Sequence, residues 1–392
     1  MRVLFLTPYF YPYRGGLENY VYNIAKRLVQ RGHEVTVLCS TKEHAPAMET
    51  IDGITVRRIP PTMILSNTPI VLNLLSRLRN LLKNEDFDII NAHMPVTYFA
   101  DIGSIYKQII NNINTPFIVT YHNDLVKPNA LDMIARVYNA TMLNIVLSSS
   151  DHIITPSPYC YFESPFLRQV KWKVSWIPPG VEVSRFEKKD YLDIRTKYGL
   201  PDNSKIVLFV GSMGRHHTHK GVDVLIRAFS NVVKEVKDAY LILVGGGNMI
   251  PRYKELARSL GVSNNVIFAG FVEDNYLPDY YLSSDVVVLP SITTAEGFGM
   301  VLIEGNAAKK PVIASSIGGM KYVVKHKKTG LLVPPKDSKN LADAIVYILQ
   351  NERDARKMGI NGRKMVRRRY EWKKISNDTE DLFNELVIHY GN

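Results

Sequence analysis

The chain has 392 residues, which is too long for one comfortable hydrophobic core and predicts two domains. Its hydrophobic content of 46% indicates globular packing throughout. No apolar run approaches the length of a membrane-spanning helix, which excludes an integral membrane protein and leaves a soluble or peripheral one. The formal net charge of +12 favours an anionic partner, which could be a nucleic acid, an anionic membrane surface or a phosphorylated substrate.

The cysteines and the N-terminus bear on location. Only Cys39 and Cys160 occur, each in or near an apolar segment and without metal-ligand spacing, so two buried thiols in a reducing compartment explain them most simply. Residues 1–8 are too short for the apolar region of a signal peptide and predict the first core strand. We therefore expect a cytoplasmic protein, with peripheral attachment to the inner face of a membrane as an open alternative.

The N-terminal half opens with an expected strand at 2–7, a helix at 17–31 and a strand at 34–39. Gly15 and Gly16 stand just before the helix, where free amides and the helix dipole suit an anion. A tight turn that needs positive φ is the alternative explanation of these glycines. Gly-x-Gly-x-x-Gly is absent, so a dinucleotide cofactor is not indicated.

A strand is expected at 54–59, and residues 60–83 after it are rich in apolar side chains and carry only basic charge. Such a segment suits contact with a membrane surface. A core helix with a basic rim explains it equally well.

Two histidines are expected at strand ends. His93 ends the strand predicted at 87–93, and His122 ends the strand predicted at 116–122. Doubly wound sheets bind ligands on this side, although a lone histidine there is often only a local hydrogen-bond partner. A helix at 131–147 and a strand at 151–155 are expected next.

The second half begins with a strand at 205–210, a loop and a helix at 222–236. The loop contains Gly211, Arg215 and Lys220. Arg and Lys beside glycines ahead of a helix suit a diphosphate, because Arg engages two oxygens and Lys supplies a point charge.

Two patterns imitate metal sites, and we expect neither to be one. Three histidines lie close together in the loop before the second-half helix, but adjacent histidines in a loop seldom converge, and no carboxylate or thiolate completes a set; they are His216, His217 and His219. Asp86 and Asp88 form Asp-x-Asp at the beginning of a strand, which predicts a helix-to-strand turn.

Strands and helices alternate through the rest of the chain. Strict alternation predicts an α/β fold with a parallel sheet and helices on both faces. Strands are expected at 239–245, 266–270, 285–290, 311–314 and 330–333, and helices at 251–260, 277–282, 341–350, 352–369 and 376–389.

The most informative stretch follows Pro290, where a buried strand ends, a glycine-rich turn follows, and a helix is expected to begin near 299 or 300. The amides of its first turn suit a phosphate. Glu296 and Glu304 flank those amides, and a carboxylate accepts hydrogen bonds from hydroxyls. Phosphate and hydroxyls together describe a nucleotide sugar, although each glutamate alone could be a solvated surface charge.

The segment Glu-Gly-Phe-Gly-Met-Val-Leu-Ile-Glu at 296–304 resembles the signature of the retaining GT-B enzymes of glycosyltransferase family 4. Phrases around His122, at 151–157 and at 177–182 are also similar to that family. The resemblance implies two Rossmann-like domains with parallel sheets that face an interdomain cleft. We expect the acceptor-side domain at 1–183, the nucleotide-sugar domain at 184–371, and a final helix at about 372–392 that crosses back to the first domain.

The resemblance also implies roles for single residues. Glu296 would orient the transferred sugar and Glu304 the ribose, and His122 would line the acceptor side. Ser212 occupies a place where many family members have Arg, so Arg215 substitutes from a longer loop, or Lys220 and backbone amides hold the diphosphate without it. The expected catalytic residues are His122, Glu296, Lys220 and Arg215. The expected donor-binding residues are Gly15, Gly16, Gly211, Arg215, Lys220, Gly270, Phe271, Glu296, Gly297, Phe298, Gly299, Met300, Val301 and Glu304.

The resemblance implies a hexosyltransferase that would use a UDP- or GDP-linked sugar and a glycan or lipid-linked acceptor, and would need neither metal nor cofactor. The anomeric configuration would be retained by front-face attack, with the leaving phosphate helping to deprotonate the acceptor. A GT-B-like nucleotide-sugar epimerase is the alternative, and it would isomerise the donor without an acceptor. A nucleic-acid-binding protein is disfavoured, because no recognisable module for nucleic acid is present.

Overall fold

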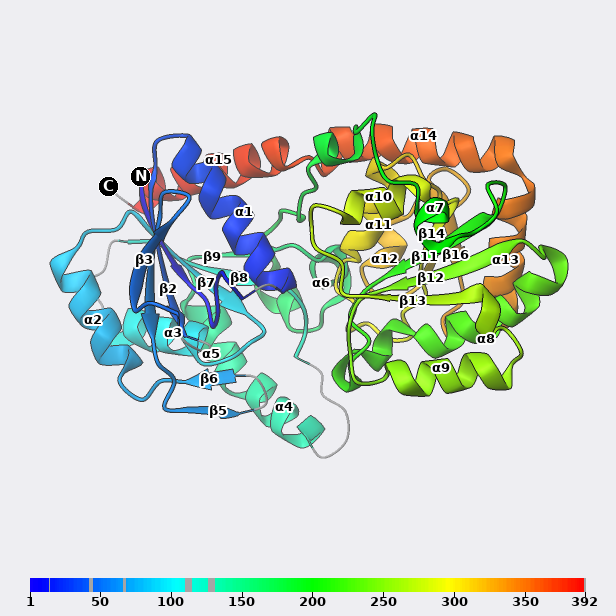
Figure 1. The fold of residues 1–392 in the computed structure, drawn as a ribbon. Helices are drawn as coiled ribbons and strands as arrows, with labels where there is room; N and C mark the ends of the chain where they lie inside the picture. Colours follow the sequence, from blue (N-terminus) through cyan, green and yellow to red (C-terminus); the bar gives the residue numbers. More distant parts are fainter. Residues whose placement is uncertain (14, 42–44, 66–67, 110–114, 126–130, 391–392) are drawn as a thin grey trace. The chain divides into compact units, whose positions relative to one another are not determined.

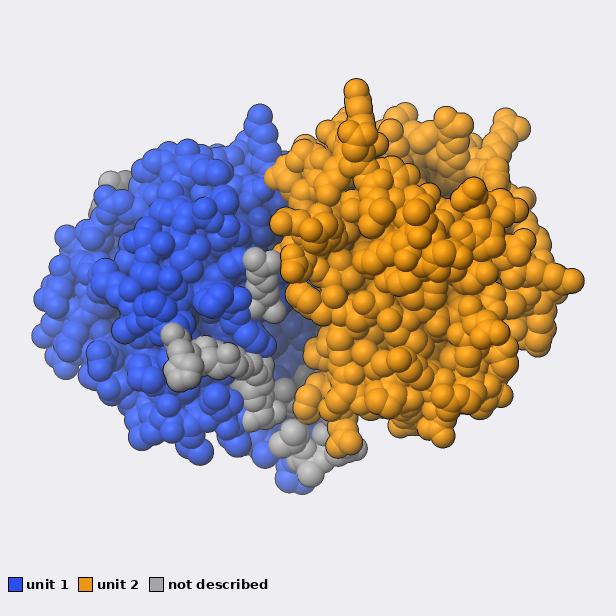
Figure 2. Space-filling model, in the orientation of Figure 1, with its two compact units in different colours: residues 1–179, 372–392 blue, residues 180–371 orange. Residues whose placement is uncertain are grey.

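The computed structural model describes residues 1–13, 15–41, 45–65, 68–109, 115–125 and 131–390. The chain forms two compact units, shown in different colours in Figure 2. Unit 1 contains Met1–Pro179 and Trp372–Asn392, and unit 2 contains Gly180–Glu371. The division therefore lies just before the boundary that the sequence placed at 183, and the final helix belongs to unit 1.

Unit 1 is built on an eight-stranded sheet with the order β10-β9-β8-β7-β1-β2-β4-β3 (Figure 1). All neighbours are parallel except β3, which runs antiparallel to β4 and was missed in the sequence. The strands are β1 (Arg2–Leu6), β2 (Glu34–Ser40), β3 (Met48–Ile51), β4 (Ile54–Ile59), β7 (Ile89–Met94), β8 (Phe117–Tyr121), β9 (His152–Thr155) and β10 (Val174–Trp176). A separate hairpin consists of β5 (Met63–Leu65) and β6 (Thr68–Ile70).

Helices cover both faces of this sheet, and β1 shows why. Leu4 and Leu6 belong to one buried cluster, whereas Val3 and Phe5 belong to another, as alternation of side chains along a strand requires. The helices are α1 (Gly16–Gln30), α2 (Leu74–Asn84), α3 (Phe99–Ile109), α4 (Leu131–Ala140), α5 (Met142–Ser149), α6 (Pro158–Glu163), the 3₁₀ helix η1 (Leu167–Lys173) and α15 (Trp372–Tyr390). Cys39 and Cys160 are buried and free, as predicted.

One expectation for unit 1 needs correction. The single helix predicted at 131–147 is wrong, because Thr141 leaves the helical conformation (φ −118°, ψ −84°) and separates α4 from α5. The Thr141 hydroxyl donates to the Val137 carbonyl at 2.7 Å, a local bond that competes with helix continuation. The Asp-x-Asp pattern does form a turn into a strand, where the Asp88 carboxylate accepts a hydrogen bond from the Arg2 amide at 2.6 Å.

The final helix, α15, packs against α1 within unit 1. Trp372, Ile375 and Phe383 enter the same buried cluster as residues of α1. Glu380 bonds to the guanidinium of Arg31 and lies 2.7 Å from Nε2 of His33. The C-terminal segment is therefore an integral part of unit 1.

Unit 2 contains a six-stranded sheet with the order β13-β12-β11-β14-β15-β16, and every pairing is parallel. The strands are β11 (Lys205–Val210), β12 (Ala239–Val244), β13 (Val266–Gly270), β14 (Val286–Leu289), β15 (Val312–Ser315) and β16 (Gly330–Val333). The helices are η2 (Val183–Phe186), α7 (Ile194–Tyr198), η3 (Arg215–Lys220), α8 (Val222–Glu235), α9 (Ile250–Ser259), η4 (Ser263–Asn265), α10 (Leu277–Ser283), α11 (Met300–Ala307), α12 (Met320–Val323), α13 (Ser338–Gln350) and α14 (Glu352–Arg369).

Each sheet has a point where the strand order reverses. In unit 2 the reversal lies between β11 and β14, and in unit 1 it lies between β1 and β7. Open α/β sheets bind ligands beyond the carboxyl ends of the strands at such a point. The residues that follow β11, β14, β1 and β7 are therefore the first to inspect.

Candidate functional site

In unit 2 the loop after β11 is packed directly against the turn after β14. Gly221 has φ +70°, and a Cβ there would lie 2.2 Å from the Pro290 carbonyl oxygen, so only glycine fits. The backbone N–H of Ile292 donates to the carbonyl of His219 at 2.7 Å. These contacts hold Lys220, at the end of η3, next to the turn that carries Glu296.

Lys220 and Glu296 form an ion pair, with Nζ 2.6 Å from Oε2. Their side chains are only 19% and 14% exposed. Burial alone would raise the pKa of the Glu296 carboxyl, but the Lys220 ammonium and the Gly299 amide hold that pKa below its usual value. Glu296 is therefore an ionised acceptor at neutral pH.

Glu304 lies eight residues further along and has a different partner. The buried Tyr281 hydroxyl donates to its Oε2 at 2.5 Å, and Tyr281 packs edge-on against Phe186 with ring centroids 5.5 Å apart. Burial raises the pKa of the Glu304 carboxyl, and the tyrosine hydrogen bond offsets only part of that effect. Sequence reasoning missed Tyr281, which stands in a short segment, 277–282, that carries no motif signal.

The glycine-rich turn between the two glutamates has the predicted form. Gly299 precedes α11 with φ +85°, and the helix begins at Met300. A Cβ on Gly319 would lie 1.9 Å from the Gly297 carbonyl oxygen, so a second glycine loop touches the turn. Phe298 is buried and packs on Tyr370, whereas Met300 and Val301 are partly buried against the unit 2 core.

The remaining predicted donor residues of unit 2 lie at the ends of β11 and β13. A Cβ on Gly211 would lie 3.1 Å from the Lys220 Cδ atom, so Gly211 lets the lysine stem pass. Gly270 has φ +69° and its carbonyl accepts a bond from the Gly245 amide at 2.8 Å. Phe271 is 81% exposed.

The loop that precedes Lys220 places the other cationic candidate differently. Arg215 is exposed, and its backbone amide donates to Oδ1 of Asn248 at 2.8 Å. His217 Nδ1 lies 3.2 Å from the Ser212 hydroxyl, and its ring centroid is 6.1 Å from that of His219. Among the residues that the structure describes, no three His, Cys, Asp or Glu side chains are grouped as a metal site would require.

In unit 1 the predicted glycines stand at the start of α1. Gly15 is extended, with φ −149°, and Gly16 is the exposed first residue of the helix. Neither glycine has a positive φ, so the tight-turn explanation does not apply to them. A Cβ on Gly15 would lie 2.3 Å from the Glu18 carboxylate, which folds back over the helix start.

The two histidines of unit 1 meet at the ends of β7 and β8. His93 Nδ1 lies 3.1 Å from His122 Nε2. His93 is fully buried and His122 is partly exposed. Burial lowers the pKa of both rings, and for His93 the neighbouring His122 lowers it further, so both are neutral at physiological pH.

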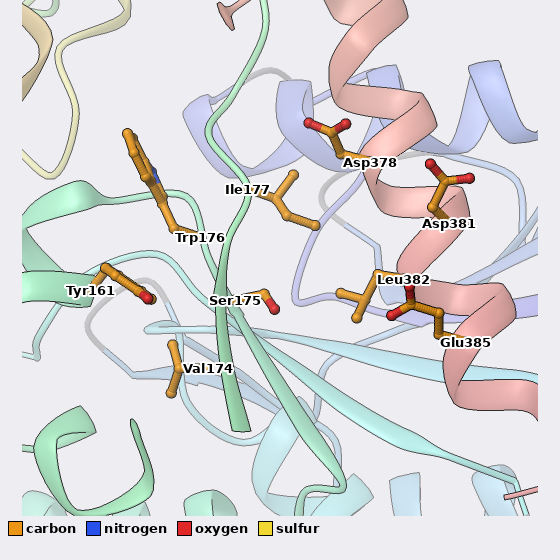
Figure 3. A pocket seen from close by; sticks show the side chains of 9 residues that line it. All are labelled: Tyr161, Val174, Ser175, Trp176, Ile177, Asp378, Asp381, Leu382 and Glu385. Atoms are coloured by element: carbon orange, nitrogen blue, oxygen red, sulfur yellow. The ribbon is translucent and has the colours of Figure 1, made fainter. Parts of the chain in front are cut away.

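A separate hollow in unit 1 has different chemistry (Figure 3). It lies between β10 and α15, and its volume is about 550 Å³. Three carboxylates from α15 and six other residues line it, namely Tyr161, Val174, Ser175, Trp176, Ile177, Asp378, Asp381, Leu382 and Glu385. None of the predicted site residues is among them. Its carboxylates would repel a diphosphate.

Comparison with known proteins agrees with this geometry. The model of the family described as glycosyl transferases group 1 matches residues 190–365, and that of glycosyltransferase family 4 matches residues 14–185. The chain belongs to the family 4 type of group 1 glycosyltransferases. It thus joins a transferase family with the GT-B fold, in agreement with the resemblance carried by residues 296–304.

Relatives of this glycosyltransferase match over nearly their full length. It is 28% identical to an uncharacterised glycosyltransferase of Methanocaldococcus jannaschii, with 97% of each chain covered. It is also 28% identical, over 97% of each chain, to the GDP-mannose-dependent alpha-(1-6)-phosphatidylinositol monomannoside mannosyltransferase of Mycobacterium tuberculosis. Among solved structures, the sucrose-phosphate synthase of Thermosynechococcus elongatus superposes with a TM-score of 0.80 at 25% identity, covering 99% of each chain. Across the described parts of the glycosyltransferase, no helix is both long and apolar enough to span a bilayer.

Proposed function

We propose that this glycosyltransferase moves a hexose from a UDP- or GDP-linked donor to a glycan or lipid-linked acceptor, with retention of the anomeric configuration and without a metal. One observation carries the proposal: a buried Lys220–Glu296 pair and a buried Glu304 stand on either side of the start of α11, at the point where the unit 2 sheet reverses its strand order. This arrangement supplies a cation, the amide end of a helix and two carboxylates that accept from hydroxyls, which together match a nucleoside diphosphate sugar.

In the proposed complex, Lys220 and the amides at the start of α11 hold the diphosphate. Departure of the nucleoside diphosphate builds negative charge on its outer phosphate, so a positioned cation stabilises the transition state more than the ground state. Arg215, which is exposed at the start of η3, would add a second contact to the diphosphate. The outer phosphate oxygen, once freed from the sugar, accepts the proton of the attacking acceptor hydroxyl.

The two glutamates take the hydroxyl groups of the donor. Glu296 is ionised and would accept hydrogen bonds from the transferred sugar, close to the diphosphate held by Lys220. Glu304 would receive the ribose hydroxyls at the oxygen that Tyr281 does not use. His122 would line the acceptor side.

Relatives favour transfer over isomerisation. The matched Mycobacterium tuberculosis protein is named for a GDP-mannose donor and a phosphatidylinositol-linked acceptor. The epimerase alternative has no comparable support. GDP-mannose is therefore the first donor to test, ahead of UDP-linked hexoses.

A thermal-shift panel tests the donor class directly. Nucleotide sugars and nucleoside diphosphates bound by the native state raise Tm, by an amount that grows with ligand concentration over Kd. We expect a shift with one nucleoside diphosphate and its sugar, and transfer of that sugar to an acceptor with retained configuration by NMR of the product. Isomerised donor formed without any acceptor would instead support the epimerase.

We also propose that unit 1 docks on an anionic membrane surface through residues 60–65 and 68–83. Each of the two interpretations from the sequence applies to a different part of this segment. The helix α2 is a core helix with a basic rim: its buried residues include Leu74, Leu78 and Leu81, and its exposed residues include Arg77, Arg79 and Lys83. The hairpin before it exposes apolar side chains, namely Met63, Ile64 and Leu65, and Leu72 follows at 75% exposed. No acidic residue occurs between 60 and 83, which complements anionic lipid; residues 66–67 lie outside the described part.

Liposome flotation at low salt tests this docking. The parent is expected to float with vesicles that contain anionic lipid and to remain below with neutral ones. Leu65→Glu should reduce flotation, whereas Ile360→Glu, which adds the same charge to an exposed apolar position of α14, should not. Absence of flotation by the parent, or an equal loss in both variants, would remove the proposed surface.

A further inference from the structure

His93 stands behind His122 because of the register of β7 and β8. His93 pairs with Thr120 across the parallel ladder, and His122 is the second residue after Thr120. Side chains two residues apart share a face of the sheet, so the two rings are neighbours. The backbone N–H of His122 also donates to the Met94 carbonyl at 3.3 Å, which extends the pairing to the point where the rings meet.

The surroundings of the two rings differ. His93 is enclosed by Phe5 from β1 and Tyr20 from α1, with ring centroids 5.7 Å and 6.1 Å away. Its Nε2 is buried and has no hydrogen-bond partner among the described residues. His122 packs edge to face with Tyr20, with ring centroids 5.1 Å apart, and the residue is partly exposed.

The unpartnered nitrogen decides where the protons lie. One N–H must stand between Nδ1 of His93 and Nε2 of His122, since a neutral imidazole has one donor and one acceptor. If His122 were the donor, His93 would carry its proton on the buried Nε2, and buried N–H groups without an acceptor are rare. If His93 Nδ1 is the donor, the buried Nε2 of His93 carries only a lone pair. His122 then accepts at Nε2 and must carry its own proton on Nδ1.

We propose that His93 is a positioning residue that fixes His122 as the neutral Nδ1–H tautomer, so that His122 meets the reacting sugars as a hydrogen-bond donor and not as a base. The inference rests on the proposed function for the role of His122, whereas the tautomer itself follows from unit 1 alone. A donor at this place suits a sugar oxygen, and it leaves the acceptor proton to the departing phosphate.

Long-range ¹H–¹⁵N spectra of the full-length chain, labelled at histidine, measure the tautomer without any substrate. The His122 signals are identified by their loss in His122→Asn. We expect a protonated Nδ1 and a bare Nε2 on His122. A protonated Nε2 on His122 would overturn the inference whatever the enzyme activity.

Two variants of His93 separate positioning from mere packing. His93→Leu removes the donor and should reduce kcat about 10- to 100-fold, as loss of a group that fixes a functional histidine commonly does, with KM for the donor changed less than about twofold. His93→Asn retains an N–H near the Nδ1 position and should restore kcat to within about threefold of the parent. His152→Asn, at another largely enclosed histidine that contacts Ser175, should leave the His122 signals unchanged.

The outcomes distinguish the two proposals. Full turnover by His93→Leu, or an Asn variant no better than the Leu variant at equal Tm, would refute positioning by His93. If the parent transfers no sugar from any donor, the proposed function fails, while the spectra still decide the tautomer.

Discussion

The two units place different kinds of polar pair at the strand ends of their sheets. In unit 2, Lys220 and Glu296 form a charged pair across the point where the sheet reverses, and in unit 1, His93 and His122 form a neutral pair at the ends of β7 and β8, to one side of the reversal. A ligand that carries a diphosphate needs charge from the protein, whereas a sugar hydroxyl needs only a directed hydrogen bond. The fold alone therefore does not determine the chemistry at a strand end. That chemistry depends on which partner each buried side chain has.

Glu296→Ala should have the largest effect, because it removes the carboxylate proposed to orient the transferred sugar and leaves the diphosphate contacts of Lys220 in place. We expect sugar transfer to fall by about 10²- to 10³-fold, the loss typical of one positioned electrostatic contact, with nucleoside diphosphate binding largely retained. Turnover is measured with saturating donor, and binding by calorimetry. Glu255→Ala, at an exposed glutamate of α9, is the control and should behave as the parent. Equal turnover of Glu296→Ala and parent would remove this residue from the mechanism.

Neutralising Glu296 and neutralising Glu304 should have different effects on the free energy of unfolding. Glu296 has a lowered pKa in the folded state, so it contributes stability above its unfolded pKa that is lost as pH falls. Glu304 has a raised pKa, so its contribution is present at low pH and is lost as pH rises through its folded pKa. At pH 7, Glu296→Gln should therefore lower the free energy of unfolding by about 3 kcal/mol, since Lys220 is left buried and unpaired, while Glu304→Gln should leave it equal or higher.

Chemical denaturation from pH 4 to pH 8 measures these free energies of unfolding. The difference between Glu296→Gln and the parent should begin to shrink at the acidic end of this range, because the unfolded parent then binds a proton that the folded parent, with its lowered Glu296 pKa, does not. Parallel losses in the two variants across this range would contradict the assignment of opposite pKa shifts.

The contiguous parts of the site can be predicted from the sequence, and the partners that distant segments supply cannot. The turn from Pro290 to Glu304 is contiguous, so its strand, glycines and helix start can be predicted from residue order, and the structure has them at β14, Gly299 and Met300. The partners come from elsewhere in the chain. Tyr281 reaches Glu304 from α10, and His93 reaches His122 through strand register, which no local pattern encodes.

The errors in secondary structure have local causes. β3 was missed because its four residues, Met48–Ile51, alternate between exposed and half-buried and include a charged side chain, which is a weak signal for an edge strand. The helix at 131–147 was drawn too long because its apolar periodicity continues through Thr141, where one hydroxyl bond to the preceding turn accompanies the break. Periodicity reports which face is buried, and it does not report where a backbone changes direction.

Lys220 and Arg215 can be separated by their contributions to diphosphate affinity. Lys220 is held by the packing of Gly221 against Pro290, whereas Arg215 is exposed and must order a long side chain to bind. Lys220→Met should weaken nucleoside diphosphate binding about 10- to 30-fold, the value of a charge-assisted hydrogen bond, and Arg215→Met less than about threefold. Calorimetry at two salt concentrations gives both values. A larger loss for Arg215→Met would show that the longer loop does substitute for the arginine that Ser212 replaces.

Tyr281→Phe should have the smallest effect, and it tests whether Glu304 depends on its own partner. Without the tyrosine hydroxyl, the larger of the two effects that offset burial is lost and only the charge of Arg185 still lowers the pKa of Glu304, so the carboxylate that would receive the ribose becomes harder to ionise. Nucleoside diphosphate affinity should fall about fivefold, the value of one hydrogen bond of about 1 kcal/mol, and the pH at which binding is half lost on acidification should move upward. Tyr280→Phe is a matched control, because the neighbouring buried Tyr280 hydroxyl bonds to Tyr198 and Lys197 instead. If both variants lose stability but only Tyr281→Phe moves the pH dependence of binding, the effect runs through Glu304; if both move it alike, the ribose contact is not controlled by this hydrogen bond.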